Sequence, residues 1–124
     1  MTYKDKIILK GMGFYGHHGW LPAEQDLGQW FEMDLELTLD LSAAGESDDL
    51  EKSLSYAEVY DKIKALAEGP SFSLIEALAA GVIKICFEFE QVQRAKVVLK
   101  KPQVPLGGPL DYAAVEMERS RGDR

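Results

Sequence analysis

The chain has 124 residues, of which 46% are hydrophobic and 28% are charged, a composition typical of one globular domain. Asp and Glu number 21 against 14 Lys and Arg, and the formal net charge of -7 disfavours binding to nucleic acid or to an anionic membrane. No apolar run approaches the ~20 residues that a membrane-spanning helix requires. No signal-peptide core follows the N-terminus, so we expect one cytoplasmic domain over residues 1–124.

Few side chains are available for a metal centre. Cys86 is the single cysteine, and His17 and His18 are the two histidines. A zinc site would therefore depend on carboxylates or on another subunit, which disfavours zinc-hydrolase and electron-transfer chemistry. Cys86 lies at helical spacing from Leu78 and Val82, which predicts that it belongs to the core. We interpret His17-His18 as a pair in a loop.

Two strands are predicted in the first third of the chain. Ile7-Ile8-Leu9 is short and apolar, and it predicts a strand that stops or bulges at Gly11-Met12-Gly13. Residues 22–28 are interpreted as a polar loop. Residues 31–41 alternate between apolar and mostly acidic side chains, which predicts a long strand with one buried face and one wet face.

Two helices are predicted in the middle of the chain, after a polar connection over residues 42–54. Ser55 and Glu58 match a capping box at the start of the first helix, which Gly69-Pro70 ends. Ser73 and Glu76 match a second capping box.

The second helix carries an apolar stripe from Leu74 to Phe87. Gly81 lies inside this helix, where it costs about 1 kcal/mol relative to Ala, and the sequence offers no reason for it.

Residues 92–100 and 111–118 complete the pattern as a third and a fourth strand, joined by a loop rich in Pro and Gly. The order ββααββ predicts an α+β fold, a four-stranded antiparallel sheet with both helices on one face. A long strand at an open edge invites pairing with another chain, so we expect copies to close the sheet into a ring barrel, with the acidic row of 31–41 inside.

Two candidate site residues lie at predicted helix starts. Glu76 either closes the capping box on Ser73 or presents an ionised carboxylate that accepts two parallel N–H donors from a ligand. Tyr56 either packs as a half-buried aromatic side chain or serves as a proton donor or acceptor.

Three further candidates carry charge. Lys100 and Lys101 are either a solvated strand end or include a base or a Schiff-base nucleophile, a role that requires a lowered pKa. Glu24 lies in the predicted loop, where carboxylates are usually solvated. None of these residues is specific by itself.

Considered together, the segments resemble the dihydroneopterin aldolase family over about residues 5–119, and their order and spacing carry the resemblance. They are Leu9-Lys10-Gly11-Met12, Phe14-Tyr15-Gly16, His18-Gly19, Glu24 through Gly28-Gln29, Asp40-Leu41-Ser42, Ala44-Gly45, Asp48-Asp49-Leu50, Ser55-Tyr56-Ala57-Glu58-Val59, Leu74-Ile75-Glu76, Leu78-Ala79 and Lys101-Pro102.

The resemblance implies the tunnelling fold, in which units of four strands and two helices form ring barrels. It implies a homo-tetramer or homo-octamer with active sites between subunits. The implied reaction is retro-aldol cleavage of 7,8-dihydroneopterin, a small-molecule pterin, to 6-hydroxymethyl-7,8-dihydropterin and glycolaldehyde. The family uses no cofactor, metal or Schiff base, and it also epimerises C2′ through the same intermediate.

The resemblance also implies roles for five residues. Glu76 would anchor the pterin through its 2-amino group and N3–H, and Ile75 would shape the pocket. Lys101, which precedes a proline as the family's lysine does, would relay the proton of the C2′ hydroxyl. Tyr56 would help to protonate the enol intermediate, and Glu24 would bind the trihydroxypropyl side chain and orient water.

Two departures from the family pattern affect the site. The loop Val104–Leu110 lacks the Pro-Gly-His-Tyr run of many relatives. Lys100 lies directly beside Lys101, so either lysine could be the one that matches the family's lysine. Two other functions stay open, a dihydroneopterin-triphosphate 2′-epimerase and a non-catalytic ring-forming scaffold. The presence of Tyr56 favours the aldolase over an oxygenase variant that lacks this tyrosine.

Overall fold

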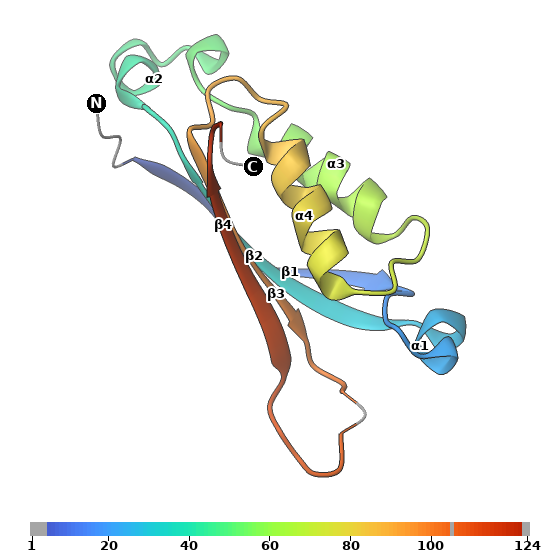
Figure 1. The fold of residues 1–124 in the computed structure, drawn as a ribbon. Helices are drawn as coiled ribbons and strands as arrows, with labels where there is room; N and C mark the ends of the chain where they lie inside the picture. The colour runs from blue at the N-terminus through green and yellow to red at the C-terminus, as the bar shows by residue number, and fades with distance from the viewer. Residues whose placement is uncertain (1–4, 105, 123–124) are drawn as a thin grey trace.

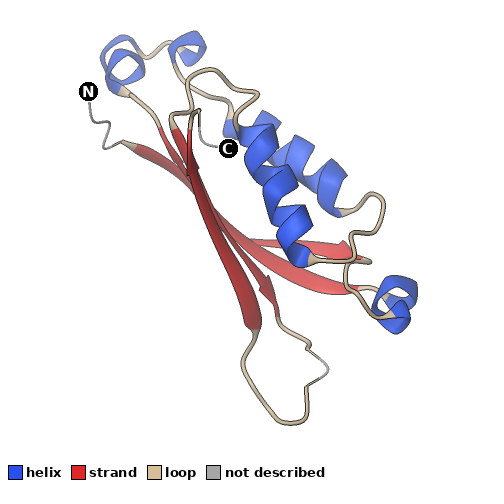
Figure 2. Cartoon of the chain, viewed as in Figure 1, coloured by secondary structure: helices blue, strands red, loops and turns tan. Residues whose placement is uncertain are grey.

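The computed structural model describes residues 5–104 and 106–122. Four strands form one antiparallel sheet in the order β1-β2-β3-β4, with the long helices on one face (Figures 1 and 2). This confirms the predicted four-stranded antiparallel sheet with both long helices on one face. The strands are β1 Lys6–Gly16, β2 Gln29–Thr38, β3 Arg94–Lys101 and β4 Ala113–Ser120.

Two helices of 12 residues each cover the sheet, α3 (Tyr56–Ala67) and α4 (Ile75–Cys86). Two short helices, α1 (Pro22–Leu27) and α2 (Ser42–Ser47), and a 3₁₀ helix (Leu50–Lys52) lie in the segments predicted as a loop and a polar connection. Within residues 5–104 and 106–122, no helix is long and apolar enough to cross a bilayer.

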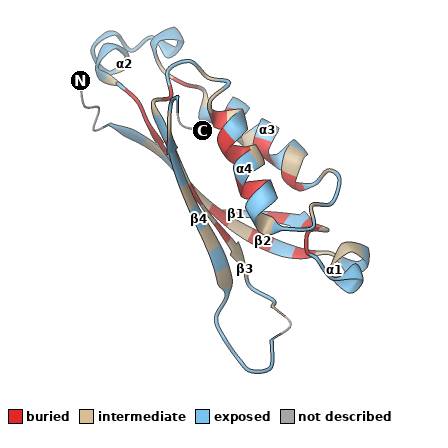
Figure 3. Ribbon diagram, in the orientation of Figure 1, coloured by how far each residue is buried: buried red, intermediate tan, exposed pale blue. Residues whose placement is uncertain are grey.

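The core lies between the sheet and α3 and α4, and β2 contributes its apolar row to it (Figure 3). Phe31, Met33, Leu35 and Leu37 are buried, which confirms the predicted alternation, although the strand ends at Thr38. Buried apolar area contributes roughly 25 cal/mol per Å² to folding, so this row holds the helices on the sheet. Cys86 is buried in the same core, as predicted.

The acidic row on the other face of β2 is only partly open to solvent. Glu36 pairs with Lys6 at 3.1 Å and with Lys96 at 3.6 Å. Asp34 accepts the backbone N–H of Gly11 at 2.8 Å. This last bond lies at a bulge, where the register of β1 against β2 shifts between Leu9 and Met12. The first strand therefore bulges and continues rather than stopping.

One predicted helix start is confirmed and one is wrong. The Ser55 hydroxyl accepts the backbone N–H of Glu58 at 3.3 Å, which is the Ser55 half of the predicted capping box, and α3 begins at the next residue. In contrast, α4 begins one residue after Leu74, and no side chain caps it, so Ser73 does not close a box with Glu76.

Gly81 has a packing reason that the sequence did not show. A Cβ at this position would lie 2.9 Å from Cδ2 of Leu66 on α3. The glycine therefore lets the two covering helices approach closely.

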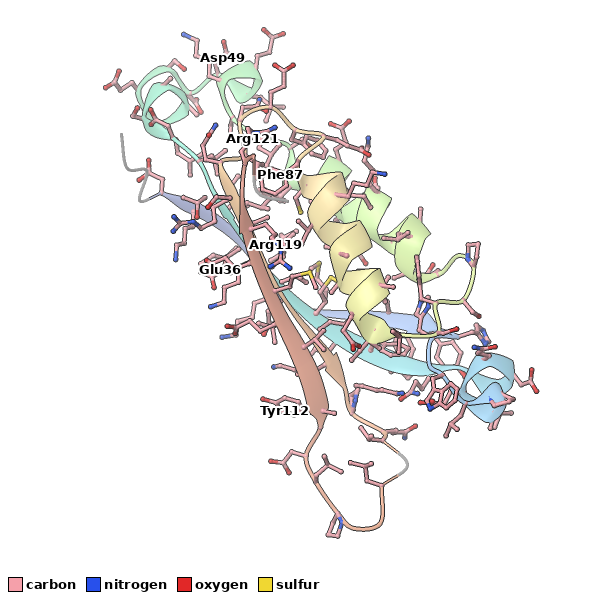
Figure 4. All side chains as sticks on the ribbon, in the orientation of Figure 1. Glu36, Asp49, Phe87, Tyr112, Arg119 and Arg121 are labelled. Atoms are coloured by element: carbon pink, nitrogen blue, oxygen red, sulfur yellow. The ribbon has the colours of Figure 1, made fainter. Side chains whose placement is uncertain are left out.

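Arg121 fastens the chain after β4 to the end of α4 (Figure 4). Its guanidinium donates to the carbonyls of Val92 at 2.9 Å and Phe89 at 2.8 Å, and it lies 5.1 Å from the Phe87 ring centroid. These contacts connect the chain after β4 to the segment that follows α4, at the end of the domain opposite to α1 (Figure 1).

Candidate functional site

An ion pair joins α1 to the end of β3. Nζ of Lys101 contacts Oε2 of Glu24, and the two side chains are only 12% and 10% exposed. Lys101 follows Leu99 by two residues, so strand alternation turns it toward the face that the helices cover. Glu24 is the third residue of α1, and the sequence prediction that it is a solvated loop carboxylate is wrong.

Three donors surround the Glu24 carboxylate. Burial disfavours the charged form of Glu24. The hydrogen bond and positive charge of Lys101 oppose this effect, as do the Leu21 backbone N–H at 3.2 Å and the Gln29 amide at 3.4 Å, and together they outweigh burial. The pKa of Glu24 therefore lies below its usual value, and the carboxylate is ionised at neutral pH.

Gln29 is a site residue that sequence reasoning missed. It is the first residue of β2 and is buried. Its amide nitrogen donates to Glu24, whereas its Oε1 has no hydrogen-bond partner among the described residues. A polar side chain in line with the buried row of β2, two residues before Phe31, was the available signal.

A pocket of about 480 Å³ opens beside the ion pair. One wall comes from α1 and Gln29, and the other comes from Pro102 and the loop that departs from the family pattern. Apart from Glu24 and two glutamines, the lining is apolar or glycine. It comprises Leu21, Ala23, Glu24, Leu27, Gly28, Gln29, Pro102, Gln103, Val104, Gly108, Pro109 and Leu110.

The neighbouring Lys100 faces the other side of the sheet. Its Nζ lies 3.1 Å from Glu32 and 3.4 Å from Asp34, and 5.2 Å from the ring centroid of Tyr112. The hydrogen bond to Glu32, opposed by burial and aided by Asp34, raises the pKa of Lys100 and keeps it protonated. Of the two lysines, only Lys101 pairs with Glu24, and neither forms a solvated strand end.

Glu76 and Ile75 begin α4, and the start of this helix lies at the same end of the molecule as α1 (Figure 1). Phe72, just before them, accepts the backbone N–H of Gly19, which leads into α1. The Glu76 side chain is exposed and makes no hydrogen bond or ion pair with any described residue. Its carboxylate is therefore available to a ligand.

Tyr56 lies at the opposite end of the helical layer. It is 60% exposed, not half-buried as one prediction had it, and it lines a second pocket with Ile7, Leu9 and Leu41. Ile7 pairs with Leu37 of β2, whereas Lys100 pairs with Glu32. At ~3.3 Å per residue, roughly 15–20 Å separates Tyr56 from the Glu24–Lys101 pair of the same chain.

His17 and His18 lie in the loop between β1 and α1, as predicted. His18 is nevertheless fully buried there, and both of its ring nitrogens form hydrogen bonds. The partners are Ala67 and Phe72, which lie 49 and 54 residues away in the sequence. Nothing local in the sequence marks such a contact.

Comparison with known proteins identifies the family to which the chain is similar. The model of the dihydroneopterin aldolase family (FolB) matches residues 7–118. A dihydroneopterin aldolase of Streptococcus pyogenes is 44% identical over 118 residues, 94% of this chain and 99% of that protein. One of Staphylococcus epidermidis is 44% identical over 116 residues, 93% of this chain and 96% of that protein.

A solved structure shows the same architecture. E. coli dihydroneopterin aldolase in complex with neopterin has a TM-score of 0.86 and 25% identity, over 94% of this chain and 100% of that chain. Fold and relatives together define an α+β lyase of folate biosynthesis. The chain belongs to the dihydroneopterin aldolase family, and dihydroneopterin aldolase is the function that these matches support.

Proposed function

We propose that the chain cleaves 7,8-dihydroneopterin by a retro-aldol reaction at the pocket beside Glu24 and Lys101. The observation that carries this assignment is the ion pair itself. An ionised carboxylate and an amine, both nearly buried, stand at the edge of a pocket large enough for part of a small heterocyclic substrate. Buried acid–base pairs of this kind are suited to proton transfer.

The pterin ring is bound by Glu76, with Ile75 shaping the pocket. The Glu76 carboxylate is free of protein partners among the described residues, and it is the second residue of α4, where the helix dipole favours its charge. Such a carboxylate accepts two parallel N–H donors, which the 2-amino group and N3–H of a pterin present. The neopterin complex of the E. coli relative supports a ligand of this class.

The reaction needs one proton removed and one returned. Lys101 relays the proton of the C2′ hydroxyl, with Glu24 as the neighbouring acceptor, and the hydroxyl oxygen becomes the carbonyl of glycolaldehyde. The C1′–C2′ bond breaks, and its electron pair moves through C6 to N5 of the dihydropterin ring. Return of a proton to C1′ then gives the hydroxymethyl product. Glu24 also binds the trihydroxypropyl side chain and orients water.

The chemistry proceeds without a metal or a Schiff base. The Lys101 amine is engaged by the Glu24 carboxylate rather than directed at a substrate carbonyl, and this favours proton transfer over imine formation. The pterin ring itself accepts the electron pair that a metal or an iminium would otherwise take. Borohydride added with substrate is expected to leave the mass of the protein unchanged, and chelator treatment is expected to leave turnover unchanged.

The complete site lies between copies of the chain. Tyr56, which would protonate the enol, is too far from Lys101 of its own chain to share a substrate with it. A homo-tetramer or homo-octamer built as ring barrels would bring Tyr56 of one copy to Lys101 of the next. The open edges of β1 and β4 are the surfaces at which such a ring would close.

Two related activities follow from the same site. Return of glycolaldehyde with the opposite face of its carbonyl turned toward the enol would epimerise C2′, so we expect a side activity as an epimerase. The triphosphate epimerase is less favoured, because no Lys or Arg is among the described residues that line the pocket. A triphosphate requires several cationic partners.

The direct test is incubation of the purified protein, in cytoplasm-like reducing buffer, with 7,8-dihydroneopterin and a chemical assay for glycolaldehyde. We expect glycolaldehyde and 6-hydroxymethyl-7,8-dihydropterin in equal amounts. The triphosphate is the comparison substrate. Faster turnover of the triphosphate, without release of glycolaldehyde, would instead support the epimerase.

A further inference from the structure

His18 is held in one tautomer by two backbone contacts. Its ring is 0% exposed and lies against Phe31 and Phe72, with centroid distances of 5.4 and 5.6 Å. Nδ1 accepts the backbone N–H of Phe72 at 3.0 Å, so this nitrogen carries no proton. Nε2 therefore carries it and donates to the carbonyl of Ala67 at 2.6 Å.

These bonds hold the segment that joins α3 to α4. Ala67 is the last residue of α3, and Phe72 comes three residues before α4 begins. The carbonyl of Phe72 accepts the backbone N–H of Gly19 at 2.9 Å. Both backbone groups of Phe72 are thus bonded to consecutive residues of the β1–α1 connection.

The same connection also places the Glu24 carboxylate. A Cβ on Gly19 would lie 2.6 Å from Oε1 of Glu24, so the carboxylate occupies the space that a side chain would fill. The side-chain amide of Gln25 donates to the Gly19 carbonyl at 2.9 Å. The β1–α1 connection at His18 and Gly19 therefore contacts both the Glu24 side chain of the ion pair and Phe72, which precedes α4.

We propose that His18 is a positioning residue, which fixes the start of α4, with Ile75 and Glu76, relative to the Glu24–Lys101 pair. The inference rests on the proposed function of Glu76 as the pterin anchor. If the anchor and the ion pair hold the two ends of one substrate, the spacing between them decides affinity. A shift of about 1 Å in such a site lowers catalytic efficiency by roughly a hundredfold.

The contact with Phe72 exists only while His18 is neutral. In an imidazolium both ring nitrogens are donors, so Nδ1–H would face the N–H of Phe72 and the bond would be lost. Burial lowers the pKa of His18, and the nearby His17 lowers it further. The hydrogen bond to Ala67 acts in the opposite direction but does not outweigh burial. The side chains that face it from β2, α3 and the α3–α4 segment, at Phe31, Ala67 and Phe72, carry no titratable group.

Two substitutions separate the two bonds. In His18→Asn, Oδ1 replaces Nδ1 and can accept from Phe72, whereas the bond to Ala67 is lost. In His18→Gln, Nε2 can donate to Ala67, whereas the acceptor for Phe72 is lost. Each variant loses one buried bond, so a purely stabilising role predicts similar effects of both on the melting temperature and none on affinity.

The measurement is the Kd of neopterin at pH 7.5 and at lower pH, with Glu76→Ala measured beside it. We expect affinity within about twofold of the parent for His18→Asn and about tenfold weaker for His18→Gln. The parent should lose affinity as pH falls through the lowered pKa of His18, which lies below the ordinary value of 6.5, and His18→Asn should lose less.

Three outcomes would overturn the proposal or its basis. Equal affinities of the Asn and Gln variants would overturn the positioning role, and so would an unchanged acid dependence in His18→Asn. If His18→Gln does not fold, the acid dependence of the parent and of His18→Asn still decides. Unchanged affinity in Glu76→Ala would instead contradict the proposed function, whatever the His18 variants do.

Discussion

Gly19 lies directly against the Glu24 carboxylate. A Cβ at Gly19 would stand 2.6 Å from Cδ and Oε1 of Glu24 and 2.8 Å from its Cβ. The φ angle of Gly19 is +149°, a conformation that residues with a side chain rarely adopt. The backbone of the β1–α1 connection thus forms one wall of the space in which Glu24 meets Lys101.

Gly19→Ala should separate Glu24 from Lys101 and lower kcat by about tenfold or more, since a shift of ~1 Å in a catalytic group has effects of this order. The strained φ should also lower the free energy of unfolding by about 1–3 kcal/mol. Steady-state kinetics and thermal unfolding measure the two effects. Gly45→Ala is the matched control, because nothing lies within 4 Å of a Cβ at that position. Full activity in Gly19→Ala would mean that the carboxylate is not confined by this contact.

The acid dependence of stability should report Glu24. A carboxyl group with a lowered pKa stabilises the folded state above its unfolded pKa, near 4.5, and this contribution disappears as pH falls through the lower, folded pKa. Glu24→Gln should therefore unfold at a lower temperature than the parent at pH 7, and the difference should shrink below pH 4.5. A difference that is constant from pH 7 to pH 3 would show that the charge of Glu24 contributes nothing.

Mixed assemblies test whether one site uses two chains. Tyr56→Phe and Lys101→Met should each be strongly impaired alone. Co-expressed in equal amounts, they should regain activity, because about one quarter of the sites would combine an intact Tyr56 with an intact Lys101 from another copy. Activity no higher than the mean of the two separate variants would place both residues in a site within one chain, or remove Tyr56 from the reaction.

Cys86 should be inert in the folded protein. Burial raises the pKa of its thiol to about 12, so almost no thiolate exists at pH 8, and the side chain is closed to solvent. An aromatic disulfide reagent at pH 8 should modify it only after denaturant is added. Rapid modification without denaturant would show that the core beneath α4 opens readily.

The elements that sequence patterns predicted are those that burial makes periodic. The alternation in β2 and the apolar stripes of α3 and α4 each reflect one buried face, so their presence could be read without the structure. In contrast, α1 has six residues, none of them buried, and its first-turn acid bonds back to the Leu21 backbone. A segment so short carries no periodic signal.

The site depends on contacts between distant segments, and for that reason only part of it could be predicted. The local sequence predicted a solvated carboxylate at Glu24, because its partner Lys101 lies 77 residues later in the sequence and α1 was not predicted. Ser73 and Glu76 matched a capping motif, but the bonds of His18 and Gly19 to Phe72 fix the entry to α4, which begins after Leu74. Local patterns do not record contacts of this kind.

The most direct measurement is the structure of the protein in complex with neopterin. The Glu76 carboxylate should accept the 2-amino group and N3–H of the pterin, and the hydroxyls of the trihydroxypropyl chain should lie beside Glu24 and Lys101. Tyr56 of a second copy should approach C1′. A pterin bound away from Glu76, or with its side chain directed away from Lys101, would contradict the account.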